Sequence, residues 1–244
     1  MKKLLTGIRS LFNLLPPKHW GPFSEISTLT KFDHAVSVSW SQGGEDLALL
    51  HMFPNQPHGN YLDVGAHHPD RFSVTRHLYE RGWSGINVEA NPKLMPKFFA
   101  KRKRDQNLNF VVGPKDNYEL AVFTETAIST VNLEWKEKFL SQKNIISELI
   151  NVKGISLRKI LDQYFPTSAV DLLCVDAEGS DLEVLQSLSF ETLEKTRFPK
   201  WVLLEADPPI KQALSTDSVN YVTSLGYVPY LVLPMSVLLK YNHE

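Results

Sequence analysis

Two short apolar runs, each with a carboxylate at or next to its end, constrain the fold of this chain more than any other feature. The first is 61–64, which is followed by Gly65, and the second is 85–88, which is followed by Glu89. A helix-like segment separates them. In α/β folds, a strand ending in a tight glycine turn and a next strand ending in an acid hold the ribose of an adenosine-containing cofactor. The pattern therefore predicts a βαβ unit with a nucleoside site.

The turn after the first run lacks the G-x-G-x-x-G spacing, because Gly65 is followed by Ala66, His67 and His68. That spacing brings backbone amides to the pyrophosphate of a dinucleotide. Its absence disfavours the alternative of an NAD(P)-dependent oxidoreductase. It favours an adenosyl ligand without pyrophosphate, so S-adenosylmethionine is the predicted cofactor.

Composition narrows the class of protein. The chain has 244 residues, 43% of them hydrophobic and 22% charged, which predicts a globular α/β domain with or without an extension. A formal net charge of −1 predicts no nucleic-acid partner. The single cysteine, Cys174, excludes an intramolecular disulfide and favours a cytoplasmic setting. No apolar run approaches the ~20 residues that span a bilayer.

The first fifteen residues carry apolar side chains at helical spacing, with Lys2, Lys3 and Arg9 among them. We expect an amphipathic helix and lead-in over 1–38, before a catalytic domain over 39–244. Two alternatives remain for residues 1–15. The helix packs on the domain or on another subunit, or it makes a peripheral contact with the inner face of the membrane.

Beyond residue 40, strand-like and helix-like segments alternate, as in a Rossmann-like, doubly wound, mainly parallel sheet. We expect a hairpin within 113–132. The basic run 101–104 is expected to be a solvated cluster at a helix end, and Asp181 a first-turn helix residue. The predicted strands are 60–64, 85–89, 108–112, 119–123, 170–175, 201–205 and 227–233. The predicted helices are 41–52, 73–81, 92–103, 133–148, 156–165, 180–189 and 211–225.

Carboxylates follow or close four of these strands, and ligands of such folds bind beyond the carboxyl ends of the strands. Glu89 is the predicted ribose ligand, since a carboxylate can accept hydrogen bonds from two hydroxyls; the alternative is a charge at a helix N-terminus. Asp63 is expected to orient the glycine turn or to bind the ammonium of the methionine moiety. Asp176 and Glu205 are the remaining members of this set.

Methyl transfer to a hydroxyl requires that its proton be removed by a base, or that a metal ion acidify it. Asp176 stands where either could operate. Asp176 and Glu205 could together hold Mg²⁺ or another hard cation through oxygen ligands. His67 and His68 follow the first strand, and one of them could be the general base.

Five blocks of the sequence, in order, resemble the FkbM-type S-adenosylmethionine-dependent methyltransferases. The resemblance covers about residues 39–235. It implies a class I methyltransferase fold and O-methylation of sugars, polyketides or related hydroxylated metabolites. The blocks are Ser41-Gln42-Gly43-Gly44-Glu45-Asp46, Asp63-Val64-Gly65-Ala66-His67-His68-Pro69, the stretch 82–92, the stretch 176–185 and Leu203-Leu204-Glu205-Ala206.

The same resemblance implies that the helix opening at residue 41 forms part of a lid over the cofactor. The leading hypothesis is an O-methyltransferase acting on a sugar, a glycan or a related small molecule. A catalytically silent adenosyl-binding protein is a further alternative. The expected cofactor-binding residues are Gln42, Glu45, Asp46, Asp63, Gly65, Ala66, Glu89 and Ala90.

Overall fold

The computed structural model describes residues 37–206 and 210–242, and from Ser39 onward the chain forms one compact unit. The predicted helix in residues 1–15, with its membrane contact, lies outside the described residues. Within 37–206 and 210–242, no helix is long and apolar enough to span a bilayer.

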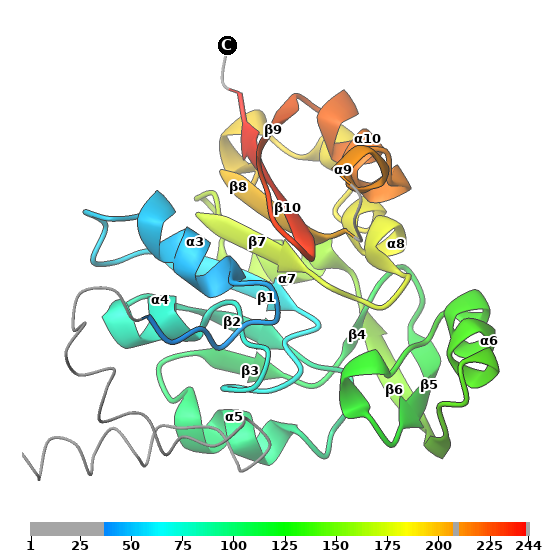
Figure 1. Ribbon diagram of the computed structural model, residues 1–244. Helices are drawn as coiled ribbons and strands as arrows, with labels where there is room; N and C mark the ends of the chain where they lie inside the picture. The colour runs from blue at the N-terminus through cyan, green and yellow to red at the C-terminus, as the bar shows by residue number, and fades with distance from the viewer. Residues whose placement is uncertain (1–36, 207–209, 243–244) are drawn as a thin grey trace, which may run out of the picture. The chain divides into compact units, whose positions relative to one another are not determined.

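A seven-stranded sheet forms the centre of this unit, in the order β3-β2-β1-β7-β8-β10-β9 (Figure 1). The first five strands are parallel, and β10 runs antiparallel to both β8 and β9. This confirms the predicted Rossmann-like, mainly parallel sheet. The strands are β1 Asn60–Val64, β2 Ser84–Val88, β3 Gln106–Leu108, β7 Leu172–Val175, β8 Trp201–Glu205, β9 Tyr227–Val232 and β10 Ser236–Tyr241.

The register of the parallel strands sets where the site forms. Val64 at the end of β1 is aligned with Val88 of β2 and Val175 of β7. Because these strands end level with one another, the residues that follow them meet at one edge of the sheet. Gly65, Glu89 and Asp176 therefore become neighbours although they are far apart in the sequence.

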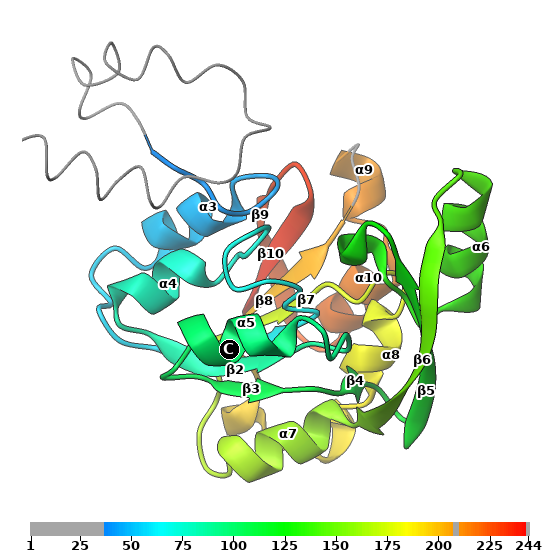
Figure 2. The same ribbon diagram turned by 90° about the horizontal axis from the view of Figure 1, so that it is seen from below.

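Helices cover both faces of the sheet, as the alternation of segments predicts (Figures 1 and 2). Leu62 and Val64 of β1 pack with one set of helices, whereas Tyr61 packs with the other. The first set is α7 Leu157–Tyr164, α8 Asp181–Gln186 and α10 Asp217–Ser224; the second includes α3 Glu45–Met52 and α4 Arg76–Arg81. The remaining helices of the layers are α5 Met95–Lys101 and the short α9 Ile210–Ala213.

A second, three-stranded sheet in the order β4-β6-β5 departs from the predicted elements. The predicted helix 133–148 is wrong beyond residue 141, because α6 Leu133–Ser141 is followed by the long strand β6 Ile146–Ile155. The apolar residues near 145–150 fit a helical spacing as well as a strand, and only their pairing with distant strands decides between the two. The partners of β6 are β4 Val111–Val112 and β5 Asn117–Phe123.

The strand pairings correct one further expectation and add one strand that was not predicted. The hairpin predicted within 113–132 is not formed, since β5 pairs with β6 and meets the segment after it only at the isolated bridge between Ala121 and Thr130. The strand β10 was not predicted, although its apolar residues complete the core beside β8.

The basic run 101–104 is not a uniform solvated cluster. The side chain of Arg102 is buried, with 1% of the residue exposed. Its guanidinium donates to the carbonyl oxygen of Pro69 at 2.9 Å, to Ser73 Oγ at 2.8 Å and to Tyr61 Oη at 3.2 Å. The prediction is therefore wrong for Arg102, which holds the loop after β1 against α5.

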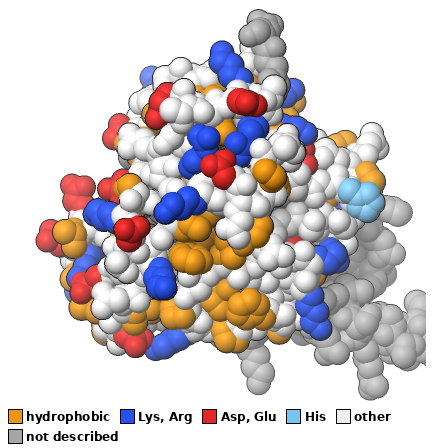
Figure 3. Space-filling view, turned by 180° about the vertical axis from the view of Figure 1, so that it is seen from behind, with side chains coloured by type: hydrophobic (Ala, Val, Ile, Leu, Met, Phe, Trp, Pro, Cys, Tyr) orange, Lys and Arg blue, Asp and Glu red, His pale blue; other side chains and the backbone are white. Residues whose placement is uncertain are grey.

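The rear face of the molecule carries basic and acidic side chains interspersed around a gathering of hydrophobic ones (Figure 3). That face presents no extended surface of a single charge.

Candidate active site

Two adjacent cavities lie at the carboxyl edge of the large sheet. They share five lining residues, and each then extends in its own direction. The first extends to α3 and β8, and the second extends to the end of β2 and to the small sheet. The shared residues are Gly65, His67, Ala127, Asp176 and Glu178.

Gly65 brings the turn after β1 close to the end of β7. Its backbone is left-handed, with φ of 79°, and a Cβ at this position would overlap the carbonyl oxygen of Asp176. Only glycine fits such a turn without strain. At the point where the two cavities meet, the backbone of the turn after β1 therefore packs directly on the backbone at the end of β7.

Glu89 lines the second cavity and is held there by backbone amides. Its Oε2 accepts from the His67 amide at 2.8 Å and its Oε1 from the Asn91 amide at 2.6 Å. Burial raises the pKa of this carboxyl to about 7, against the lowering effect of the two amides. Each carboxylate oxygen keeps a second lone pair. The side chain can therefore still accept hydrogen bonds from a ligand in the cavity.

The other walls of the second cavity are largely apolar. They come mainly from the ends of β1 and β2, the turn after β2, the loop after β7, α8 and the small sheet, and only Ala90 among them was predicted. Such a slot beside an anchored carboxylate suits a planar aromatic base joined to a ribose. The apolar lining residues are Val64, Val88, Ala90, Phe110, Val111, Val112, Leu120, Val131, Ala177 and Val184.

Three carboxylates gather at the first cavity. Oxygen atoms of Asp176, Glu178 and Glu205 lie within 4.8 Å of one another. The structure thus brings the predicted pair Asp176 and Glu205 together and adds Glu178, which sequence reasoning missed. Oxygen ligands of this kind suit a hard cation, and closely spaced carboxylates also suit a shared proton.

The charge state of Asp176 follows from its surroundings. Asp176 is exposed to the cavity, yet the surrounding protein removes enough water to raise the pKa of its carboxyl. The neighbouring Asp63 carboxylate raises it further, and a hydrogen bond with Glu205 lowers it. Asp63 itself lies deeper and accepts from Thr75 Oγ1 at 2.8 Å, with a pKa raised by burial to about 6.

Segment 41–46 contains three predicted cofactor-binding residues, and two of them line the first cavity. Gln42 and Glu45 line it, and Glu45 Oε1 accepts from Ser236 Oγ at 3.2 Å. Asp46 lines neither cavity. It is fully buried and accepts from the Trp40 amide at 2.6 Å and from Ser41 Oγ at 2.8 Å. Asp46 therefore organises the turn before α3 in this conformation.

The structure separates the two histidines. His67 lines both cavities, has a left-handed φ of 49° and contacts Thr126 Oγ1 through Nε2 at 3.0 Å. Its Nδ1 is buried and has no hydrogen-bond partner among the described residues. Burial, followed by the Arg71 charge, lowers the pKa of His67 to about 4. His67 is therefore a neutral imidazole at pH 7.

His68 lines neither cavity. Its Nδ1 accepts from the amides of Asp70 at 3.1 Å and Arg71 at 3.0 Å, which fixes the loop. Burial lowers its pKa to about 4 as well. The structure therefore does not bring the predicted base candidate His68 to either cavity.

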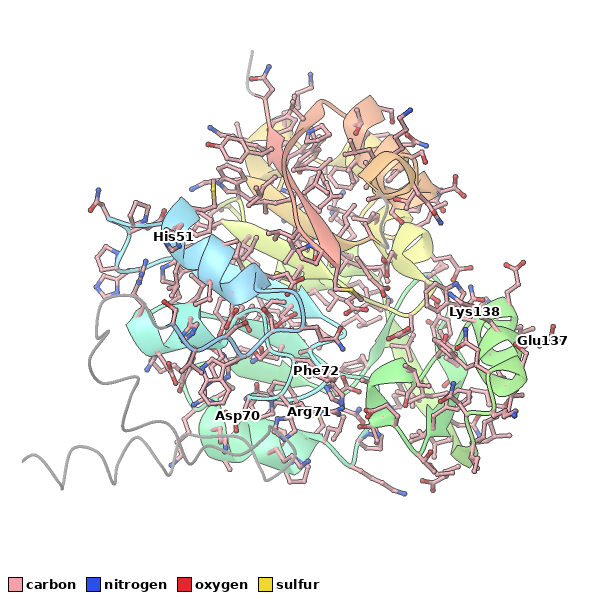
Figure 4. The ribbon with its side chains drawn as sticks, in the orientation of Figure 1. His51, Asp70, Arg71, Phe72, Glu137 and Lys138 are labelled. Carbon is pink, nitrogen blue, oxygen red and sulfur yellow. The ribbon has the colours of Figure 1, made fainter. Side chains whose placement is uncertain are left out.

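Two loops meet over the shared part of the cavities. Arg71 donates to both carboxylate oxygens of Glu125, at 2.8 and 2.7 Å, and its guanidinium lies 4.0 Å from the centre of the Phe72 ring (Figure 4). The 3₁₀ turn η3 Thr126–Ile128 follows and supplies Ala127 to both linings. No single residue of the 124–130 segment was predicted at the site, because the position of this segment depends on the strand β5 before it.

Asp181 accepts a hydrogen bond from the backbone of the loop after β7. This residue is 8% exposed, and its Oδ1 accepts from the Ala177 amide at 2.7 Å. Burial and then the charge of Asp176 raise the pKa of Asp181 to about 8. As predicted, Asp181 is a first-turn helix residue, since it begins α8; its buried carboxyl also fixes the loop after β7 through the Ala177 amide.

Comparison with known families decides the class of protein. Residues 63–229, more than half of the chain, match the methyltransferase FkbM domain. The chain belongs to this family. As predicted from the sequence blocks, it is an FkbM methyltransferase with an α/β fold of the class I type.

Solved structures similar to this FkbM methyltransferase include three other methyltransferases, each at a TM-score of 0.41 or 0.42. A TehB-like SAM-dependent methyltransferase from Corynebacterium glutamicum is 11% identical, over 91% of this chain and 100% of that one. A precorrin-6y C5,15-methyltransferase from Geobacter metallireducens is 10% identical, over 86% and 95%. A human methyltransferase 10 domain containing protein is 9% identical, over 90% and 96%. No curated protein matches the chain significantly.

Proposed function

We propose that this FkbM methyltransferase transfers the methyl group of S-adenosylmethionine to a hydroxyl of a sugar, a glycan or a related hydroxylated metabolite. One observation carries the proposal. A mainly apolar cavity anchored by Glu89 and a carboxylate-lined cavity at Asp176 meet at Gly65. Such a pair of sites suits a nucleoside on one side and an acceptor on the other.

The residues of the second cavity fit the adenosyl group. Glu89 offers free lone pairs beside apolar walls. Because the two cavities share lining residues such as His67 and Asp176, one ligand can extend from one cavity into the other. When bound, the cofactor supplies an electrophilic methyl group on its sulfonium. Asp63, Gln42 and Glu45 line the cavity on the far side of Gly65, where their polar groups can bind an amino acid moiety.

The carboxylates of the first cavity would act on the acceptor. Asp176 accepts the proton of the acceptor hydroxyl as the new bond forms, and Glu178 and Glu205, in the same cavity, accept hydrogen bonds from neighbouring hydroxyls of the acceptor. Positioning contributes as much as basicity, since the acceptor oxygen must lie in line with the methyl group. His67, neutral and at the junction of the cavities, is the remaining base candidate.

Glu89→Ala is expected to weaken binding of S-adenosylhomocysteine by about 1–3 kcal/mol, because a buried charged hydrogen-bond partner of the ribose is lost. Isothermal titration calorimetry measures the affinity directly. Glu194→Ala, which removes an exposed carboxylate, is the matched control and should bind as the wild type does. Equal affinity of the two variants would remove Glu89 from the cofactor site.

The alternative functions give different results in simple assays. An oxidoreductase would show an ultraviolet difference spectrum with NADH. A silent adenosyl-binding protein would bind S-adenosylhomocysteine and yet release no methylated product from any hydroxylated acceptor. Turnover of tritiated S-adenosylmethionine with a sugar acceptor supports the proposal over both.

Chelation separates the two uses of the carboxylate cluster. If Asp176 and Glu205 hold a divalent cation that acidifies the acceptor, EDTA abolishes turnover and Mg²⁺ or Mn²⁺ restores it. If Asp176 acts as a base alone, turnover is unchanged by EDTA.

A further inference from the structure

A groove of about 470 Å³ runs beside the carboxylate cluster, between α6 on one side and α8 and α10 on the other. It is separate from the two cavities described above but shares Glu205 with the first of them. A molecule whose reactive group lies at the cluster can therefore continue into the groove. The groove is lined by Trp135, Lys138, Gly179, Asp181, Leu182, Glu183, Glu205, Ala206, Gln212, Thr216, Asp217 and Ser218.

The wall on the α6 side is built around Trp135. A Cβ at Gly179 would overlap the indole ring, so the ring lies directly on the loop after β7. The Lys138 ammonium lies 3.8 Å from the centre of the same ring. Lys138 is on the side of α6 toward α8, whereas its neighbour Glu137 lies on the opposite side of the helix (Figure 4).

The chemistry of the lining indicates the kind of ligand. Carboxylates, the Gln212 amide and the hydroxyls of Thr216 and Ser218 offer many hydrogen bonds beside one aromatic side chain. Sugars combine such hydroxyls with apolar C–H faces. Among the lining residues that the structure describes, Glu183, Glu205 and Asp217 stand against the single cation Lys138. Like charges across an interface are unfavourable, so this balance disfavours phosphorylated and other anionic ligands.

We propose that this groove binds the second and following units of a neutral oligosaccharide, whose first unit presents its hydroxyl to Asp176. The assignment rests on the proposed function and adds the length and charge of the acceptor. The assignment also implies an order for methylation and glycosyl transfer. A sugar still linked to a nucleotide would bring its pyrophosphate toward these carboxylates, so methylation follows the glycosyl transfer that builds the chain.

The test is binding to the enzyme loaded with S-adenosylhomocysteine. The probes are neutral oligosaccharides of two to four units, the methyl glycosides of their terminal units, and matching oligosaccharides that carry phosphate or uronic acid. We expect at least one neutral oligosaccharide to bind about tenfold tighter than its monosaccharide and tighter than its anionic counterparts.

The groove itself is tested by a pair of substitutions that each remove one carboxylate charge. Glu183→Gln, in the groove, is expected to weaken oligosaccharide binding about three- to tenfold, as for the loss of one or two hydrogen bonds. Glu137→Gln, on the opposite side of α6, should leave the affinity unchanged. Affinity for S-adenosylhomocysteine serves as the internal check that both variants are folded.

The possible failures are distinguishable. If the wild-type enzyme does not bind S-adenosylhomocysteine, the proposed function fails, and the groove assignment falls with it. If the enzyme binds this compound but no neutral oligosaccharide, or binds anionic ones best, only the groove assignment is overturned. Equal oligosaccharide affinities of Glu183→Gln and Glu137→Gln also overturn it.

Discussion

Asp176→Asn is expected to lower kcat for methyl transfer by about a hundred- to ten-thousand-fold, the range for loss of a general base. The substitution keeps the shape of the side chain but removes its ability to accept the proton of the acceptor. Glu89 and the apolar walls of the second cavity are untouched, so affinity for S-adenosylhomocysteine should stay near the wild-type value. Radiometric transfer and calorimetry measure the two quantities separately.

The pH profile gives an independent readout of the same residue. Desolvation and the Asp63 charge raise the pKa of Asp176 above the ordinary value of an aspartate. Because the ionised form is the base, kcat should fall as the pH drops through this raised pKa, and the fall should begin at a higher pH than for an ordinary aspartate. Asp116→Asn, at an exposed position, is the control. Equal turnover of Asp176→Asn and Asp116→Asn would exclude Asp176 from the chemistry.

Arg102→Ala is expected to lower the free energy of unfolding by about 3–5 kcal/mol, as when one partner of a buried ionic pair is removed. Asp105 Oδ2 lies 3.9 Å from the Arg102 guanidinium, and both side chains are almost fully buried. Without Arg102, the carboxylate keeps its bond from Tyr61 Oη at 2.6 Å but loses the compensating charge. The carbonyl oxygen of Pro69 also loses its donor.

Denaturant unfolding measures this change, and the neighbouring residue provides the control. Lys103 is exposed, so Lys103→Ala should stay within about 0.5 kcal/mol of the wild type. If the two alanine variants were equally stable, the buried network would not hold the loop after β1. The contrast is informative because the sequence shows only four consecutive basic residues.

Local patterns were sufficient for the main layers of the fold. The apolar runs at 60–64, 85–89, 170–175 and 201–205 are short, continuous and separated by helical periodicity, and each became a strand of the large sheet. Because parallel strands end at a common edge, the positions of Asp63, Glu89, Asp176 and Glu205 at that edge followed from the same patterns. The family blocks around these strands agree with the FkbM domain match.

The small sheet could not be predicted in this way. Ile146–Ile155 contains apolar residues at spacings that suit a helix or a strand. Its strand conformation depends on pairing with Asn117–Phe123 and Val111–Val112. The residues that this sheet contributes to the second cavity, such as Val112 and Leu120, were missed for the same reason.

Side chains that look alike in the sequence acquired different environments. Glu45 and Asp46 are adjacent, yet the first lines a cavity and the second is enclosed by the turn before α3. Similarly, His67 lines both cavities whereas His68 lines neither. Arg102 is buried whereas Lys103 is exposed. Neighbouring residues point in different directions once the backbone turns, and no pattern of residue types encodes those directions.

The amino-acid sequence alone thus predicted the parallel sheet, the carboxylates at its edge and the family. Hydrophobic periodicity and the residue types at strand ends are local properties of the chain. Long-range packing established the second cavity, the addition of Glu178 to the carboxylate cluster and the groove beside Trp135. Each of these brings together segments that are distant along the chain, and their contacts exist only after the sheets have paired.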